Sequence, residues 1–296
     1  MTIMKYPIST SMGHVTGLTL ADGSNWDIIA ANERSYDVVS ALAKAMQLQT
    51  LDKSAQNQSS YSTPRQLLVQ VEGPKRDSAQ PSKTALLTVK NQNTICALIS
   101  KEINEMPMAQ LMPLSMVICL DAQYRGGVLL HGALAEWNGN GVILAGPTGR
   151  GKTTASRRLP QHWQSLCDDM TLVVCDHKGA YWAHPWPTWS EFMFGGTGGT
   201  WDVQNSVPLK GIFFLEQAHE DALEPLGMAQ GVCLLNESAE QAHCFISIHS
   251  EKNELRRIRL LRFDNICALA KTIPSYVLRL GRDGAFWQEI ERSLNG

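Results

Sequence analysis

Hydrophobic and polar positions alternate with a short period at the start of the chain and then change to a longer one. Two alternating segments, residues 16–20 and 26–30, flank a polar Ala-Asp-Gly-Ser-Asn stretch, and this pattern predicts a β-hairpin. Residues 33–49 then place apolar side chains three and four positions apart, as expected of an amphipathic helix. The chain is therefore predicted to open with a β-β-α unit.

The pattern changes again after Arg125, where short apolar runs are punctuated by glycine. Before that point we expect exposed loops at 50–64 and 73–84, which are rich in Ser, Gln, Lys, Asp and Pro. The other elements expected there are three strands and a methionine-rich helix, at residues 65–72, 85–90, 94–100 and 107–123. We predict an N-terminal α+β domain at 1–115 and a second domain at 116–296.

The strongest chemical signal is a glycine-rich segment that matches G-x-x-x-x-G-K-[ST] between an expected strand, 141–145, and an expected helix, 153–159. Such a loop turns backbone N–H groups toward phosphate oxygens, while Lys152 contacts the β- and γ-phosphates and the Thr153 hydroxyl binds Mg²⁺. We therefore predict an ATP and Mg²⁺ site. Its residues are Gly146, Pro147, Thr148, Gly149, Arg150, Gly151, Lys152, Thr153 and Thr154.

A pair of aspartates follows the loop closely. Residues 165–186 read as a strand, Asp168-Asp169, a second strand, a turn and a third strand, which predicts antiparallel β-structure directly after the loop helix. Phosphoryl transfer to an alcohol uses one carboxylate to hold Mg²⁺ and another to orient or deprotonate the hydroxyl. We assign the hydroxyl to Asp168 and Mg²⁺ to Asp169, although the sequence alone does not separate the two roles.

The order of three motifs carries a family resemblance. Leu-His-Gly-Ala-Leu-Ala at 130–135, the phosphate loop and Cys-Asp-Asp at 167–169 together resemble the HPr kinase/phosphorylase family, which is related to the nucleotide-binding part of phosphoenolpyruvate carboxykinase. Segments further along are more similar to the SynChlorMet cassette protein ScmC family. These segments are 158–160, 184–191, 201–203, 207–216 and 286–287.

The resemblance implies an α/β fold with a mixed sheet, of the HPr kinase C-terminal or phosphoenolpyruvate carboxykinase-like P-loop type. It also implies an ATP- and Mg²⁺-dependent kinase that phosphorylates a serine- or threonine-type hydroxyl of a peptide or small molecule, in ribosomal peptide natural-product biosynthesis. His131 would lie near the phosphates as a catalytic residue, with a core-facing histidine as the alternative. The Glu-[Ile/Val]-Arg-Gly-Leu-Gly signature of HPr kinases is missing, so recognition of HPr and the reverse reaction are not implied.

Tryptophan is unusually frequent, with eight residues against seven Phe and six Tyr, and five of the eight lie between 163 and 201. An aromatic wall beside a glycine-rich run can exclude water and bind an acceptor. We therefore expect Trp186, Trp189 and Trp201 to line an acceptor pocket, with Glu191 as a ligand for an acceptor amine or the metal. The alternative is that these rings pack in the core.

Two other functions fit the same loop. Residues 211–216 form an apolar run that ends in Glu216, so the chain is alternatively a P-loop NTPase switch or assembly factor with a metal-coordinating acid there. A nucleotide- and peptide-binding protein without catalytic turnover is the other possibility.

The composition of the chain limits the kinds of binding partner that we expect. Lys and Arg number 26 and Asp and Glu 28, a formal charge of −2, so no global field favours nucleic acid. The seven cysteines are scattered without C-x-x-C spacing, which predicts buried, reduced thiols. Neither a targeting segment nor a membrane-spanning run is visible. We expect a cytoplasmic protein with no membrane partner, and family analogy suggests a homo-oligomer.

Overall fold

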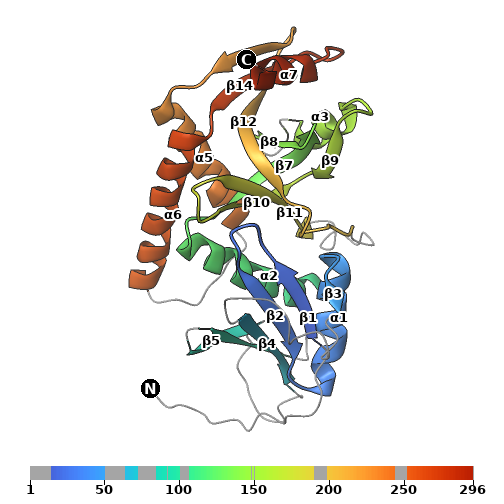
Figure 1. The fold of residues 1–296 in the computed structure, drawn as a ribbon, viewed down its shortest axis with the longest axis vertical. Coiled ribbons are helices and arrows are strands. Elements are labelled where there is room, and N and C mark those ends of the chain that lie inside the picture. Colours follow the sequence, from blue (N-terminus) through green and yellow to red (C-terminus); the bar gives the residue numbers. More distant parts are fainter. Residues whose placement is uncertain are drawn as a thin grey trace. The chain divides into compact units, whose positions relative to one another are not determined.

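The computed structural model describes residues 15–50, 64–72, 85–91, 93–100, 107–147, 149, 151–189, 199–243 and 252–295. These residues fall into two compact units, which are interleaved in sequence. The first unit takes the described residues of 1–19, 24–115 and 189–200, and the second those of 20–23, 116–188 and 201–296. Each unit is built around its own mixed sheet (Figure 1).

The first unit contains a six-stranded sheet in the order β3-β1-β2-β4-β6-β5. Its strands are β1 Val15–Thr19, β2 Asn25–Ala30, β3 Gln49–Thr50, β4 Arg65–Glu72, β5 Ala85–Asn91 and β6 Thr94–Ser100. The predicted hairpin is confirmed, because β1 and β2 pair antiparallel. The three later strands are also confirmed, and Trp26, Ile28 and Leu67 are buried in the core of this unit.

The predicted helix at 33–49 is too long at both ends. Glu33–Ser35 forms a short 3-10 turn, η1, because Asn32 and Ser35 make reciprocal side-chain to backbone hydrogen bonds. The α-helix proper, α1, spans Tyr36–Ala45, and Gln47 follows with a φ of 50°. A left-handed residue ends a helix, so the apolar spacing beyond Ala45 did not continue it.

The second unit contains an eight-stranded sheet in the order β11-β10-β7-β8-β12-β14-β13, with β9 paired to β7. Strands β8, β12 and β14 are parallel, whereas β7, β9, β10 and β11 extend the sheet by antiparallel pairing. The expected α/β class with a mixed sheet is therefore confirmed. The strands are β7 Val128–Trp137, β8 Asn140–Ala145, β9 Gln164–Cys167, β10 Met170–Cys175, β11 Tyr181–Trp186, β12 Val207–Gln217, β13 Ala222–Pro225 and β14 Ser275–Leu280.

Helices pack along this sheet. In Figure 1, α5 and α6 lie to the left of its strands and α3 lies to the right. The helices are α2 Pro107–Tyr124, which runs from the first unit into the second, α3 Lys152–Arg158, α5 Met228–His243, α6 Lys252–Thr272 and α7 Trp287–Asn295. Buried residues of α3 and α7, including Ala155 and Ile290, join Leu144 and Phe213 of the sheet in one hydrophobic cluster.

The strand directions bring three chain segments to one edge. Since β8 and β12 are parallel, the loop that follows Ala145 lies beside the carboxyl end of β12. Strand β7 pairs antiparallel with β8, so Gly132 lies opposite Ala145 and His131 comes next to the glycine-rich loop that follows β8. A Cβ at Gly132 would lie 2.7 Å from Ile143 Cγ2, so glycine permits this close pairing. Strand β10 then places Met170 opposite His131.

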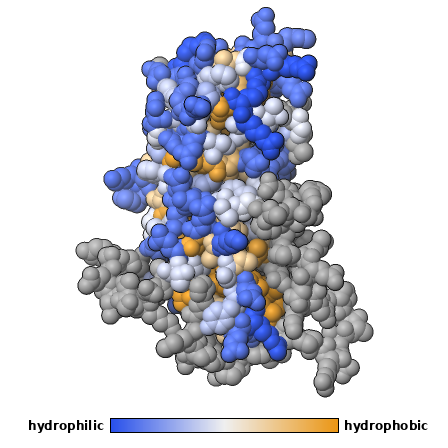
Figure 2. All heavy atoms as spheres, turned by 90° about the vertical axis from the view of Figure 1, so that its right-hand side faces the viewer, coloured by the Kyte–Doolittle hydropathy of each residue, from blue (hydrophilic) through white to orange (hydrophobic). Residues whose placement is uncertain are grey.

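None of the described helices is long and apolar enough to span a membrane. On the face in Figure 2, the described residues present hydrophobic patches separated by hydrophilic side chains. The six described cysteines are free, as expected. Of these thiols, Cys119 and Cys167 are buried as predicted, whereas Cys96, Cys175 and Cys267 are half-buried. Cys233 on α5 is exposed, so the prediction of a buried thiol is wrong for that residue.

Candidate functional site

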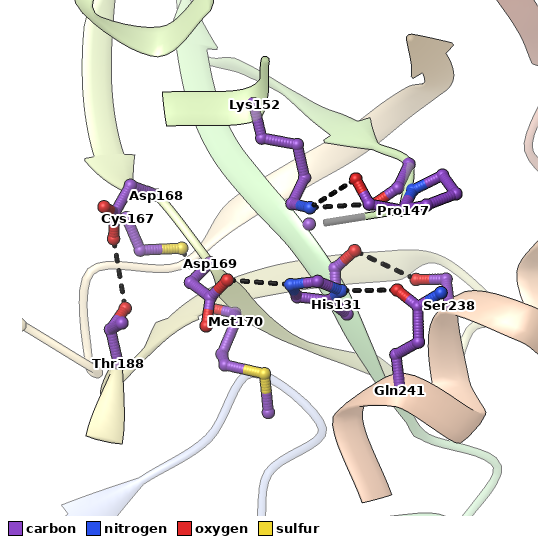
Figure 3. Close-up of polar contacts among 12 residues, drawn as sticks. His131, Pro147, Lys152, Cys167, Asp168, Asp169, Met170, Thr188, Ser238 and Gln241 are labelled. Atoms are coloured by element: carbon purple, nitrogen blue, oxygen red, sulfur yellow. Dashed lines mark hydrogen bonds and ion pairs between the residues drawn. The ribbon is translucent and has the colours of Figure 1, made fainter. Parts of the chain in front are cut away.

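Lys152 is the first residue of α3 and has a buried side chain, 7% exposed. Its Nζ donates to the carbonyl oxygens of Gly146, at 2.8 Å, and Pro147, at 3.3 Å (Figure 3). Burial lowers the pKa of Lys152, while the charges of Asp169 and Asp168 act in the opposite direction. No carboxylate of the described chain lies within ion-pair distance of Nζ, so this cation is neutralised only at longer range.

The loop before Lys152 depends on glycine. Gly149 and Gly151 have φ angles of 85° and 96°, a region that glycine occupies without strain. The carbonyl of Gly149 accepts a hydrogen bond from Nε2 of Gln217, at the end of β12, at 3.4 Å. Thr153 and Thr154 follow on α3 with exposed side chains. Thr148 and Arg150, also predicted to bind nucleotide, lie outside the described residues.

The two aspartates form the bend between β9 and β10 and have different partners. Asp169 Oδ1 lies 2.8 Å from His131 Nε2 (Figure 3). Asp168 Oδ1 accepts a hydrogen bond from the Thr188 hydroxyl at 3.0 Å. Both carboxylates are half-buried, and Asp169 Oδ2 has no hydrogen-bond partner in the described chain. The bend therefore holds two acids in separate environments.

His131 contacts polar groups at both ring nitrogens. Its Nδ1 lies 2.6 Å from Gln241 Oε1 on α5, and its side chain is 12% exposed. The Ser238 hydroxyl donates to the His131 backbone carbonyl at 3.1 Å. The ring is largely buried and both nitrogens are paired with side chains, so the core-facing alternative and the catalytic role both stay predictions.

The geometry brings four predicted residues together in the second unit. Lys152 comes from α3, His131 from β7, and the aspartates from the β9–β10 bend, so the segments meet only through the sheet pairing. Together they offer a buried cation and two carboxylates. Whether these residues bind nucleotide and perform catalysis stays a prediction.

The tryptophans are more buried than an open acceptor wall requires. Trp186 is fully buried, and Trp201 is 7% exposed. Trp189 is also buried, and its indole N–H donates to the Ser115 hydroxyl within the first unit. This burial favours the packing alternative for the described residues. Glu191 lies outside the described residues, and the acceptor role of this segment stays a prediction.

Glu216 has a different environment from the aspartates. It is exposed at the end of β12 and lies 3.7 Å from the Arg279 guanidinium on β14. Within the described chain, no three His, Cys, Asp or Glu side chains gather as a metal cluster. A groove of about 460 Å³ between α2 and α6 contains none of the candidate residues and is lined by Tyr124, Arg256 and Leu260 among others.

The sequence did not reveal Thr188 or Gln241 as partners of the site. Thr188 lies two residues after Trp186 in a segment noted only for its aromatic content. Gln241 lies 110 residues after His131, on a helix that carries no motif. No sequence motif marks Gln241, because Gln241 contacts His131 only once α5 packs on β7.

A family model described as SynChlorMet cassette protein ScmC matches residues 94–295 of the chain. The match covers the described part of β6, α2 and the whole second sheet, including Lys152 and both aspartates. No curated protein gives a significant match.

Proposed function

The chain belongs to the SynChlorMet cassette protein ScmC family, and we propose that it is an ATP- and Mg²⁺-dependent kinase that transfers the γ-phosphate to a hydroxyl of a peptide or small molecule. The observation that carries the proposal is the buried Lys152 ammonium beside an Asp pair whose members have separate partners. We also propose that the second unit has the HPr kinase-like P-loop fold.

The residues of the site fit a nucleotide and its metal. Burying the Lys152 cation without a contacting carboxylate is unfavourable, and an anionic phosphate compensates for it. Mg²⁺ prefers oxygen ligands and usually binds through one or two carboxylates together with substrate phosphates. Asp169 Oδ2 and the Thr153 hydroxyl supply such oxygens. When bound, Mg²⁺ neutralises phosphate charge during transfer.

The two aspartates then have distinct tasks. Asp168, oriented by Thr188, accepts the proton of the acceptor hydroxyl. The acceptor oxygen forms a bond to the γ-phosphorus as the bond from that phosphorus to the β–γ bridging oxygen breaks, and ADP leaves. Lys152 stabilises the negative charge on the phosphates, and His131 keeps Asp169 oriented.

The free cysteines of the described chain are consistent with a reducing cytoplasm, where we place the protein.

The test is transfer of label from [γ-³²P]ATP, with Mg²⁺, to free serine, free threonine and Ser- and Thr-containing peptides. We expect a labelled acceptor, a loss of at least about 100-fold in Asp168→Asn, and retained transfer in Glu216→Gln. Label released to water alone, lost in Glu216→Gln and kept in Asp168→Asn, would instead identify an NTPase switch. ATP binding without transfer to any acceptor or to water would identify a non-catalytic binding protein.

A further inference from the structure

Helix α5 contacts His131 of strand β7 at two separate points. Gln241 Oε1 lies 2.6 Å from the ring Nδ1, and the Ser238 hydroxyl donates to the backbone carbonyl at 3.1 Å (Figure 3). The far ring nitrogen, Nε2, lies 2.8 Å from Asp169 Oδ1. A continuous chain of polar contacts therefore runs from α5 through His131 to the bend between β9 and β10.

The direction of these hydrogen bonds follows from the groups involved. An ionised carboxylate can only accept, so Nε2 of His131 must donate to Asp169. Nδ1 is then a donor or an acceptor according to whether it carries a proton. Gln241 suits both cases, because its amide presents an oxygen acceptor and a nitrogen donor of nearly the same shape. A methionine side chain of similar length offers neither.

We propose that Gln241 is a positioning residue, which fixes the His131 ring so that Nε2–H stays directed at Asp169 Oδ1. One oxygen of Asp169 is thereby fixed, and Oδ2 is left for a cation. Groups that orient a ligand in this way usually contribute 10- to 100-fold to activity or metal affinity. The kinetic part of this inference rests on the proposed kinase function, whereas the orientation of the ring does not.

Gln241 is not needed to attach the helix. Leu235, Ser238, Ala239 and Ala242 are buried on α5, while Gln241 is half-buried. Replacing its amide by a group of similar length therefore leaves the apolar packing of α5 in place. Ser238→Ala is the matched control, because it removes a contact between the same helix and the same residue without touching the ring.

The experiment compares wild type, Gln241→Met and Ser238→Ala by long-range ¹H–¹⁵N NMR of the histidine rings, with His131→Gln used for assignment, and by steady-state kinetics. In Gln241→Met we expect displaced His131 ring ¹⁵N signals, a kcat about 10- to 100-fold lower and a KM for ATP within about twofold of wild type. In Ser238→Ala we expect the ring signals and kcat of wild type.

Each other outcome has a definite meaning. Unchanged His131 ring signals in Gln241→Met would overturn the inference. Equal loss of kcat in Gln241→Met and Ser238→Ala, with equally lowered Tm, would also overturn it by showing a purely structural contact. If the ring signals are displaced but the protein transfers no phosphate, the positioning of the His131 ring by Gln241 is upheld. The kinetic role of Gln241 and the proposed kinase function are then both overturned.

Discussion

At the scale of single residues, the site is defined by charges that are only partly compensated. Lys152 is buried against two backbone carbonyls, and burial lowers its pKa. Asp168 and Asp169 adjoin in sequence but bond to Thr188 and His131, respectively. Two neighbouring acids with different partners are suited to different steps, because each partner fixes the direction in which its carboxylate presents a free oxygen.

This difference predicts separable effects of two conservative substitutions. In the proposed mechanism Asp168→Asn removes the proton acceptor, so we expect kcat to fall at least about 100-fold with nearly unchanged affinity for MgATP. Asp169→Asn removes the proposed charged oxygen ligand, so we expect a higher Mg²⁺ concentration for half-maximal activity. Activity measured over a Mg²⁺ titration separates the two. The assignment of roles would be reversed if Asp168→Asn alone raised the Mg²⁺ requirement.

The residues of the site differ in how far the sequence predicts them. Lys152 and the aspartates carry their own motif, since glycine spacing and adjacent acids are local features. Thr188 and Gln241 do not, because their relation to Asp168 and His131 is created by sheet pairing and helix packing. Local spacing cannot encode a contact between chain segments 110 residues apart.

At the scale of elements, helix α3, which follows the glycine-rich loop, is held by contacts at its C-terminal end. Arg158, the last residue of α3, donates to the carbonyls of Gly281 and Gly284 at 3.0 and 2.6 Å. Its guanidinium also lies 5.3 Å from the ring centroid of Phe286. Asp221 accepts from the Gly281 N–H on the other side of this loop. A helix of only seven residues gains its stability from such tertiary contacts.

We therefore predict that Arg158→Ala lowers the free energy of unfolding by about 2 kcal/mol, because two charge-assisted hydrogen bonds and a cation–π contact are lost. The neighbouring Arg157 is exposed, so Arg157→Ala should change stability by less than about 0.5 kcal/mol. Urea denaturation measures both. Equal stability of the two variants would contradict the role of Arg158.

Elements were predicted better where a pattern was bounded by turn residues. The β-hairpin of β1 and β2, the strand pair at the Asp-His-Lys-Gly turn and the short α3 are confirmed. The helix expected at 33–49 extended past both of its real ends, because apolar spacing says nothing of the cap at Asn32 or the left-handed Gln47.

At the scale of the second unit as a whole, two histidines link stability to pH: His184 is buried and His243 is half-buried. His184 accepts from the Ala21 N–H at Nε2 and donates to the Val203 carbonyl at Nδ1, and burial lowers its pKa. Burial lowers the pKa of His243 from 6.5 to about 4. A histidine whose folded pKa is depressed stabilises the fold above its unfolded pKa, and this contribution is lost as pH falls toward the folded value.

We accordingly expect the free energy of unfolding to fall between pH 6.5 and about 4, with His243 contributing on the order of 3 kcal/mol to that fall. In His243→Gln the fall should be smaller, because the substituted side chain does not titrate. Urea unfolding at several pH values gives the slope. The same slope in wild type and His243→Gln would contradict this prediction.

The sequence predicted the fold class of the second unit better than it predicted the environment of the tryptophans. The antiparallel strands after the glycine-rich loop were predicted from their pattern, the mixed α/β class was implied by the family resemblance, and the structure confirms both. Tryptophan frequency suggested an acceptor wall, but Trp186 is fully buried. A count of tryptophans does not show whether a ring is buried, because burial depends on which face of the strand carries the side chain.

The central claim is that Lys152 and Asp169 form an MgATP site, and calorimetric titration with ATP tests it without knowledge of the acceptor. We predict binding that is stronger in Mg²⁺ than in EDTA and at least about tenfold weaker in Lys152→Met, with the Mg²⁺ effect lost in Asp169→Asn. Lys178→Ala, in the exposed β10–β11 turn, should bind as wild type does. Absence of ATP binding by folded wild type, or equal binding by Lys152→Met, would contradict the account.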